Sequence, residues 1–316
     1  MPVRIAARLV ARPFFRAQDP KLRYLPESPR VIGRSVYWVS IQYAHEATTG
    51  GLNILDLDTR ANRHIPLPGR PGFVGVSDRD GEIVIGLERR LVRFNLAAER
   101  ITETLAHLPE DPRVIINDGL STPVGLFFGT KDLAIRDPIA ALYHFDFATG
   151  VLSELLAGQV CSNGKYFHDG VLVDIDSGPR TITEYRFDGA LHRTRLIAPP
   201  GALPGIPDGM RPAPGGENVV VAFVDLDPSH DGVAQEIRLS DGAVLAEWSF
   251  PGAPRVTCPE FIELDGTTHL LFTTASEGAE SPDAGTLFVA AYPGTDQTDQ
   301  TDIGNTPVPG VLDRSL

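Results

Sequence analysis

The chain has 316 residues, of which 42% are hydrophobic and 22% charged, and a formal net charge of −13. This acidic balance argues against a nucleic-acid partner, because binding to a phosphate backbone needs clustered Lys and Arg. Without an apolar run near the roughly 20 residues that cross a bilayer, we expect no membrane partner either. The composition is typical of a soluble globular protein, which we expect in the cytoplasm.

Residues 1–18 carry four arginines and no acid before Asp19, which faintly resembles a transit peptide. Arg8 interrupts the apolar stretch 5–10, so the segment is a poor secretory signal, and we predict a first strand with solvated arginines instead. The two cysteines, Cys161 and Cys258, match no zinc motif and form no disulfide framework, so we expect two buried free thiols.

Short segments rich in Val, Ile, Phe and Tyr follow one another between Gly and Asp turns, and convincing helical periods are absent. One series of predicted strands covers residues 36–41, 82–86, 126–129, 171–174, 219–222 and 269–272. A second series follows at a fixed offset, at 52–57, 91–96, 142–147, 182–187, 235–239 and 286–290. Pairs that recur every 40 to 50 residues or so are typical of four-stranded propeller blades. We therefore predict an all-β chain that forms a single six-bladed β-propeller domain over 1–316, with 294–305 as a polar surface loop.

Four polar motifs stand near the expected inner strands of four different repeats. They are 26–29 (Pro-Glu-Ser-Pro), 116–119 (Ile-Asn-Asp-Gly), 162–164 (Ser-Asn-Gly) and 207–210 (Pro-Asp-Gly-Met). Each alone is an ordinary turn sequence. Together they place Glu, Asn and Asp, the oxygen ligands that hard cations prefer, at one mouth of a propeller channel.

These motifs resemble those of the SMP-30 (regucalcin) and gluconolactonase family over about residues 25–275. The first motif followed by strand 36–41 is similar to the family's Glu-Gly-Pro and Leu-Tyr-Trp-Val-Asp-Ile. The second is similar to its Asn-Asp-Gly, the third to its Asn-Gly, and the fourth is its Pro-Asp-Gly-Met unchanged.

The resemblance implies a metal-dependent hydrolase that opens a lactone. It implies one divalent ion held by Glu27, Asn163 and Asp208, with Asn117 as a substrate or water-mediated ligand and Asp208 as general base. Ca²⁺ is the expected ion, and Mg²⁺, Mn²⁺ and Zn²⁺ accept similar ligands. The expected partner is a small lactone or ester, and the protein is expected to be a monomer or small homo-oligomer.

The chain departs from the family pattern beside the second motif. Ile115 stands where lactonases acting on sugar lactones often have an Arg, and Arg113 is one strand step further away. An Ile in place of this Arg predicts a less polar pocket, so specificity for sugar lactones is in doubt. Lys131 and Asp132 follow the next strand and are candidates, with Arg113, to bind the substrate; a solvated loop is the alternative for both.

Two acidic features are left without a role. Glu260 has no place in the ligand set, and the stretch 225–231 is predicted to be a surface turn, because it lacks the spacing of a calcium loop. Two other functions stay open: a propeller that hydrolyses organophosphates with the same metal, and a metal-binding propeller without catalysis.

Overall fold

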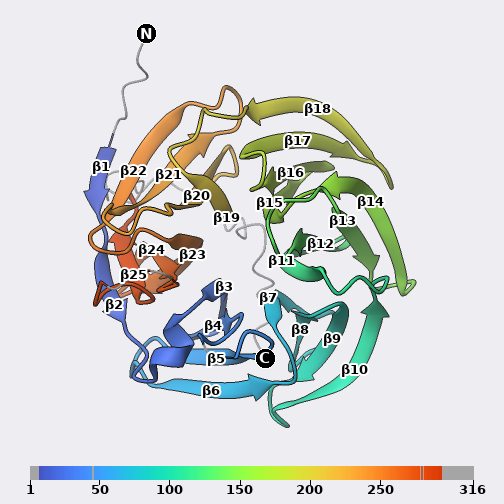
Figure 1. Ribbon diagram of the computed structural model, residues 1–316, viewed down its shortest axis with the longest axis horizontal. Helices are drawn as coiled ribbons and strands as arrows, with labels where there is room; N and C mark the ends of the chain where they lie inside the picture. Colours follow the sequence, from blue (N-terminus) through green and yellow to red (C-terminus); the bar gives the residue numbers. More distant parts are fainter. Residues whose placement is uncertain (1–6, 45, 278, 280, 294–316) are drawn as a thin grey trace.

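The computed structural model describes residues 7–44, 46–277, 279 and 281–293, and places them in six sheets around one axis (Figure 1). This confirms the prediction of an all-β, six-bladed propeller. The described helical structure is one 3₁₀ turn, η1 (Pro20–Arg23). No helix within the described ranges is long and apolar enough to cross a membrane. The predicted surface loop 294–305 lies outside the described residues.

The first three blades follow the chain from the axis outward, each with its strands in sequence order. Blade 1 contains β3 (Pro26–Ile32), β4 (Ser35–Ser40), β5 (Gly50–Asp56) and β6 (Asn62–Leu67). Blade 2 contains β7 (Pro71–Val76), β8 (Glu82–Leu87), β9 (Arg90–Asn95) and β10 (Arg100–His107). Blade 3 contains β11 (Val114–Thr122), β12 (Gly125–Asp132), β13 (Ala140–Asp146) and β14 (Val151–Gln159).

The last three blades continue around the ring (Figure 1). Blade 4 contains β15 (Ser162–His168), β16 (Val171–Asp176), β17 (Thr181–Phe187) and β18 (Leu191–Ala198). Blade 5 contains β19 (Ile206–Pro212), β20 (Asn218–Val224), β21 (Gly232–Arg238) and β22 (Val244–Phe250). Blade 6 contains β23 (Val256–Leu264), β24 (Thr267–Thr274) and β25 (Leu287–Ala291).

The N-terminal arm completes the ring. Strand β2 (Arg12–Phe15) pairs antiparallel with β25 and is the outer strand of blade 6, so the two ends of the propeller meet in one sheet. Strand β1 (Ala7–Val10) pairs parallel with β22 as a fifth strand of blade 5. The expected first strand is therefore two short strands, with Arg8 and Arg12 exposed. The arm joins blades 5 and 6 along their outer edges (Figure 1).

The two series of predicted strands are the second and third strands of each blade. Those middle strands are buried on both sides by neighbouring blades and by the strands of their own sheet, so they read as apolar runs. The polar motifs stand at the inner strands, as the sequence suggested: two of them open β3 and β15, and the other two lie within β11 and β19. Innermost strands carry polar and Pro or Gly residues, and outer strands face water, so neither shows a strong hydrophobic pattern.

Large apolar side chains fill the space between blades. Trp38 and Trp248 are fully buried in two different clusters. Trp248 lies with Phe250 and Phe272 between blades 5 and 6, and the Phe250 and Phe272 ring centroids are 4.8 Å apart. Fully burying such a side chain contributes about 1.5–3 kcal/mol, and these contacts fix the angle between blades and hence the geometry at the axis.

Candidate metal centre

Every innermost strand has a shift in register against its neighbour at a corresponding place. The shifts fall between Glu27 and Arg30 in β3, Pro71 and Phe73 in β7, Ile116 and Gly119 in β11, Ser162 and Lys165 in β15, Pro207 and Met210 in β19, and Val256 and Cys258 in β23. A bulge bends a strand and redirects a side chain out of the regular alternation. In β3 the irregular step follows Glu27 directly, where Ser28 has a positive φ of 48°.

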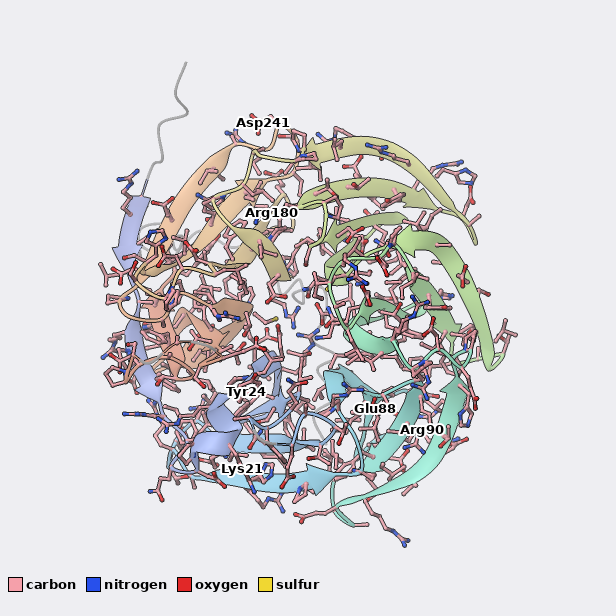
Figure 2. All side chains as sticks on the ribbon, viewed as in Figure 1. Lys21, Tyr24, Glu88, Arg90, Arg180 and Asp241 are labelled. Atoms are coloured by element: carbon pink, nitrogen blue, oxygen red, sulfur yellow. The ribbon has the colours of Figure 1, made fainter. Side chains whose placement is uncertain are left out.

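The residues at the six bulges form one ring of positions, in which Glu27 is the last paired residue before the bulge of β3 and the other five lie within their bulges. They are Glu27, Gly72, Asn117, Asn163, Asp208 and Thr257, whose numbers rise by 45, 45, 46, 45 and 49 residues. Figure 2 shows side chains of the blades extending into the centre of the ring. Four of the six positions carry a carboxylate or amide oxygen, and these four are the residues that the sequence motifs singled out. The structure therefore brings all four to one level of the channel.

Hydrogen bonds fix the two asparagines of this ring. The Asn117 amide nitrogen donates to the backbone oxygen of Ser162 at 3.2 Å. The Asn163 amide nitrogen donates to a carboxylate oxygen of Asp208 and, at 3.1 Å, to Ser177 Oγ. Ser177 Oγ in turn donates to the backbone oxygen of Pro207 at 2.6 Å, which ties blade 4 to blade 5. Since both NH₂ groups are used as donors, each Oδ1 oxygen is left as an acceptor for a ligand.

The two ring carboxyl groups lie close enough to perturb each other. Burial, followed by the charges of Asp208 and Asp118, raises the pKa of Glu27 well above its ordinary value. Burial raises the pKa of Asp208 to about 7, although the charge of Lys131 and the hydrogen bond from Asn163 lower it. A hydrogen bond between the Glu27 and Asp208 carboxyl groups requires one of them to hold a proton. Unaided, the two carboxyl groups therefore do not both ionise near neutral pH.

A divalent cation fits this arrangement. Two buried carboxylates that cannot both ionise unaided become stable as a pair when a cation lies between them. Among the described residues, no group of three or more His, Cys, Asp and Glu side chains is arranged to hold a metal ion. An ion here would therefore use the amide oxygens of Asn163 and Asn117 together with the Glu27 and Asp208 carboxylates. An all-oxygen set of this kind suits Ca²⁺ or Mg²⁺.

Both cysteines are free and buried, as predicted, and both lie beside the ring. Cys161 Sγ is 3.5 Å from the Asn117 amide nitrogen, and the Cβ of an alanine at Gly209 would be 2.4 Å from Cys258 Sγ. Burial raises the pKa of Cys161 to about 12 and that of Cys258 well above its ordinary value. Both are therefore thiols near neutral pH, and neither is a ready nucleophile.

The other candidate substrate residues lie at the end of β12 and just before β11. Lys131 pairs with Ile115 across β12 and β11 and forms a bridge with Cys161. The Asp132 carboxylate accepts hydrogen bonds from the backbone nitrogens of Arg136 and Asp137, at 3.0 and 2.9 Å, and so holds the loop after β12. Arg113 is 56% exposed and forms an ion pair with Asp111 at 2.9 Å, whereas Ile115 is buried.

Glu260, which had no role on sequence grounds, belongs to an ion cluster further along the inner strands. Its Oε2 oxygen is 3.3 Å from Arg211 Nε and 3.6 Å from Arg30 Nη1. Arg30 and Arg211 follow Glu27 and Asp208 by three residues in β3 and β19, and both also donate to the backbone oxygen of Pro29. The cluster joins blades 1, 5 and 6. The acidic stretch 225–231 is an exposed turn, as expected, with Asp225 bonded to His230 at 2.8 Å.

A family model described as the SMP-30/Gluconolactonase/LRE-like region matches residues 25–276. The chain belongs to this family. Its fold resembles that of a calcium-binding protein, regucalcin, from Agrobacterium tumefaciens, with 22% identity and a TM-score of 0.76 over 90% of this chain and 95% of that one. A luciferin-regenerating enzyme is 20% identical, with a TM-score of 0.73 over 90% of this chain and 96% of its own.

A gluconolactonase from Xanthomonas campestris is 17% identical, with a TM-score of 0.64 over 92% of this chain and 98% of its own. At these identities the three structures establish the fold that this SMP-30/gluconolactonase/LRE-like chain shares with them. A search of curated proteins gave no significant match.

Sequence reasoning missed two ring positions of this SMP-30/gluconolactonase/LRE-like propeller. At Gly72 a Cβ would be 2.1 Å from the backbone oxygen of Asn117, so blade 2 contributes close backbone packing and no side chain. Thr257 donates through its Oγ1 to the backbone oxygen of Pro26 at 2.7 Å, which closes blade 6 onto blade 1. The 45-residue spacing between the known motifs would have found Gly72, because it lies midway between Glu27 and Asn117.

The support behind Asn163 was also missed. Lys165 is fully buried, donates to the backbone oxygen of Asn163 and lies 3.2 Å from Asp174 Oδ1. Ser162 Oγ and Gln159 Nε2 bond to the same carboxylate at 3.1 and 2.6 Å. The sequence did offer a signal for this support, because Lys165 stands in one predicted strand region and Asp174 in the next.

Proposed function

We propose that this protein is a metal-dependent lactonase that hydrolyses a cyclic ester. The observation that supports the proposal is the meeting of Glu27, Asn117, Asn163 and Asp208 at corresponding bulges of four blades. A propeller that served only as a scaffold would have no use for two mutually destabilising acids in its channel, since isolated buried carboxylates cost free energy.

Glu27, Asn163 and Asp208 would hold the ion, with Asn117 beside them. Ca²⁺ is our first candidate, because the ligands are all oxygen and a relative of the same fold is described as calcium-binding. When bound, a divalent ion polarises the ester carbonyl and lowers the pKa of a coordinated water. Mg²⁺, Mn²⁺ and Zn²⁺ are the alternatives that reconstitution would compare.

Asp208 would act as general base. Its pKa of about 7 in the absence of metal shows how strongly burial affects this carboxyl group, and the Asn163 amide fixes its orientation. Asp208 would accept a proton from the attacking water as the water oxygen bonds to the ester carbon. When the ring C–O bond breaks, the same proton would pass to the leaving alkoxide, so the product is a hydroxy acid. No side chain becomes covalently attached.

The residues around the proposed metal site favour a substrate whose lactone ring is less polar than that of a sugar lactone. Ile115 is buried two residues before Asn117, where an arginine would otherwise bind hydroxyl groups, and the Arg113 guanidinium is engaged with Asp111. A hydrogen-bonding site whose donor is replaced by an apolar side chain loses its preference for hydroxylated substrates.

Acid release from a panel of lactones tests the proposal, with the protein stripped by EDTA and then reloaded with each metal. We expect hydrolysis that stops on chelation and returns with Ca²⁺ or another divalent ion. Metal binding without hydrolysis of any lactone would favour a non-catalytic propeller. Hydrolysis of an organophosphate ester and of no lactone would move the activity to the second enzymatic alternative, which uses the same ion.

A further inference from the structure

Lys131 is set between the two strands that carry the ring asparagines. It is the cross-strand partner of Ile115, two residues before Asn117, and the bridge partner of Cys161, two residues before Asn163. The side chain is partly buried. Its charge lowers the pKa of Asp208, Glu27 and Cys161, so the ammonium group lies within electrostatic reach of the ring.

The sequence has three lysines among 28 basic residues, and two of them, Lys131 and Lys165, flank this ring. Lys165 is paired with Asp174 at 3.2 Å, and Lys21 with Asp19 at 3.5 Å. Among the described residues, no carboxylate oxygen lies within ion-pair distance of Lys131. A partly buried ammonium without a counterion costs free energy that a bound anion would recover.

The charge at the ring after metal binding shows which ligand would supply that anion. A divalent ion balances the ionised Glu27 and Asp208 carboxylates, and Asp118, a third buried acid that acts on this pair, lies within electrostatic reach of the Lys165 ammonium. Lys131 then adds one positive charge on the side where Ile115 and Cys161 make the wall apolar. The Lys131 ammonium beside these apolar side chains would favour a ligand with a negatively charged group at this position.

Resting on the proposed lactonase function, we propose that the substrate is a lactone that carries a carboxylate outside the ring, and that the Lys131 ammonium binds this carboxylate. Lys131 is thus a specificity-determining residue. It would not stabilise the oxyanion of the reacting ester, because that role would speed the hydrolysis of neutral and acidic lactones alike.

Two lactones that differ in one group test the inference. 5-Oxotetrahydrofuran-2-carboxylate, a γ-lactone without ring hydroxyl groups, carries a carboxylate where 5-(hydroxymethyl)dihydrofuran-2-one has a hydroxymethyl group. We expect the wild-type protein to prefer the acidic lactone in kcat/KM by about tenfold or more. Lys131→Met should remove this preference, so its loss in kcat/KM on the acidic lactone should exceed its loss on the neutral lactone by about tenfold. Lys21→Met is the matched control, since Lys21 lies on blade 1 away from the axis (Figure 2), and should change neither value.

Equal losses on both lactones in Lys131→Met, or no preference in the wild-type protein, would overturn the inference. Equilibrium binding tests it even if no lactone is hydrolysed, which would count against the proposed function alone. Calorimetry would compare 2-hydroxyglutarate, with two carboxylates, and 4,5-dihydroxypentanoate, with one, on the Ca²⁺-loaded protein. Tighter binding of 2-hydroxyglutarate that is lost in Lys131→Met supports the inference, and equal affinities refute it.

A metal titration without any organic ligand checks the position of the ammonium. Removing a positive charge near the ion should tighten Ca²⁺ binding by about threefold to tenfold in Lys131→Met and leave Lys21→Met unchanged. Unchanged Ca²⁺ affinity in Lys131→Met would place the ammonium too far from the ring to bind a substrate there.

Discussion

At the scale of single residues, Asp208 has to serve in two ways that conflict. As the metal ligand that we propose it would be ionised, whereas as a buried carboxyl group beside Glu27 it resists ionisation, and burial raises its pKa to about 7. Asn163 reduces the conflict by donating a hydrogen bond to the carboxylate, and Ser177 holds Asn163 in the orientation that allows it. The ring therefore depends on neutral amides to keep an acid in place.

Replacing Asp208 should remove turnover more completely than replacing its neighbour. Asp208→Ala is expected to lower kcat by at least about a thousandfold, since a base and a metal ligand are lost together. Asn117→Ala removes one amide contact and should mainly raise KM, by about tenfold. Steady-state kinetics with saturating Ca²⁺ gives both values, and calorimetry shows whether the ion still binds. Full activity in Asp208→Ala would exclude this residue as the base.

At the scale of elements, bulges and strand order decide which side chains reach the axis. A regular innermost strand would point successive side chains to opposite faces of its sheet, whereas the shift after Pro207 in β19, or after Ser162 in β15, redirects one polar residue per blade. The outer edge has a different task. Strand β2 supplies the fourth strand of blade 6 from the opposite end of the chain, and so closes the ring.

The N-terminal arm gives a prediction with an internal control. Deleting residues 1–16 removes both β1 and β2, and deleting residues 1–10 removes β1 alone. Loss of β2 leaves β25 as an unpaired edge, so the longer deletion should lower the unfolding midpoint by roughly 5–10 °C more than the shorter one. Differential scanning calorimetry measures both. Equal midpoints for the two truncations would show that β2 contributes little to closure.

At the scale of the whole molecule, the two ring carboxyl groups carry an electrostatic cost that depends on pH. Asp208 ionises at its ordinary value of 3.8 in the unfolded chain and at about 7 in the folded chain. Between these values the folded state binds more protons, so the contribution of this group to the free energy of unfolding falls as pH rises and is lost above about 7. The same direction holds for Glu27, whose pKa is also raised.

Comparison of wild type with Asp208→Asn in EDTA isolates this effect, because the other titrating groups are common to both. From about pH 5 to about pH 8, wild type should lose about 1–3 kcal/mol of stability relative to the variant. Excess Ca²⁺ should cancel the loss in the wild-type protein, because the ion binds the ionised carboxylates. Chemical denaturation at the two pH values provides the measurement. A stability difference that does not change with pH would contradict a raised pKa.

The sequence by itself determined the all-β architecture, the number of blades and the four ring residues. Repeated apolar middle strands and polar motifs are local patterns, and they do not depend on knowing which segments meet. Only the tertiary structure showed that Glu27 and Asp208 come together from blades far apart in the chain, that Thr257 closes blade 6 onto blade 1, and that Glu260 pairs with Arg30 and Arg211. These contacts arise from ring closure, and closure depends on the packing between blades and on β2, neither of which leaves a periodic trace in the sequence.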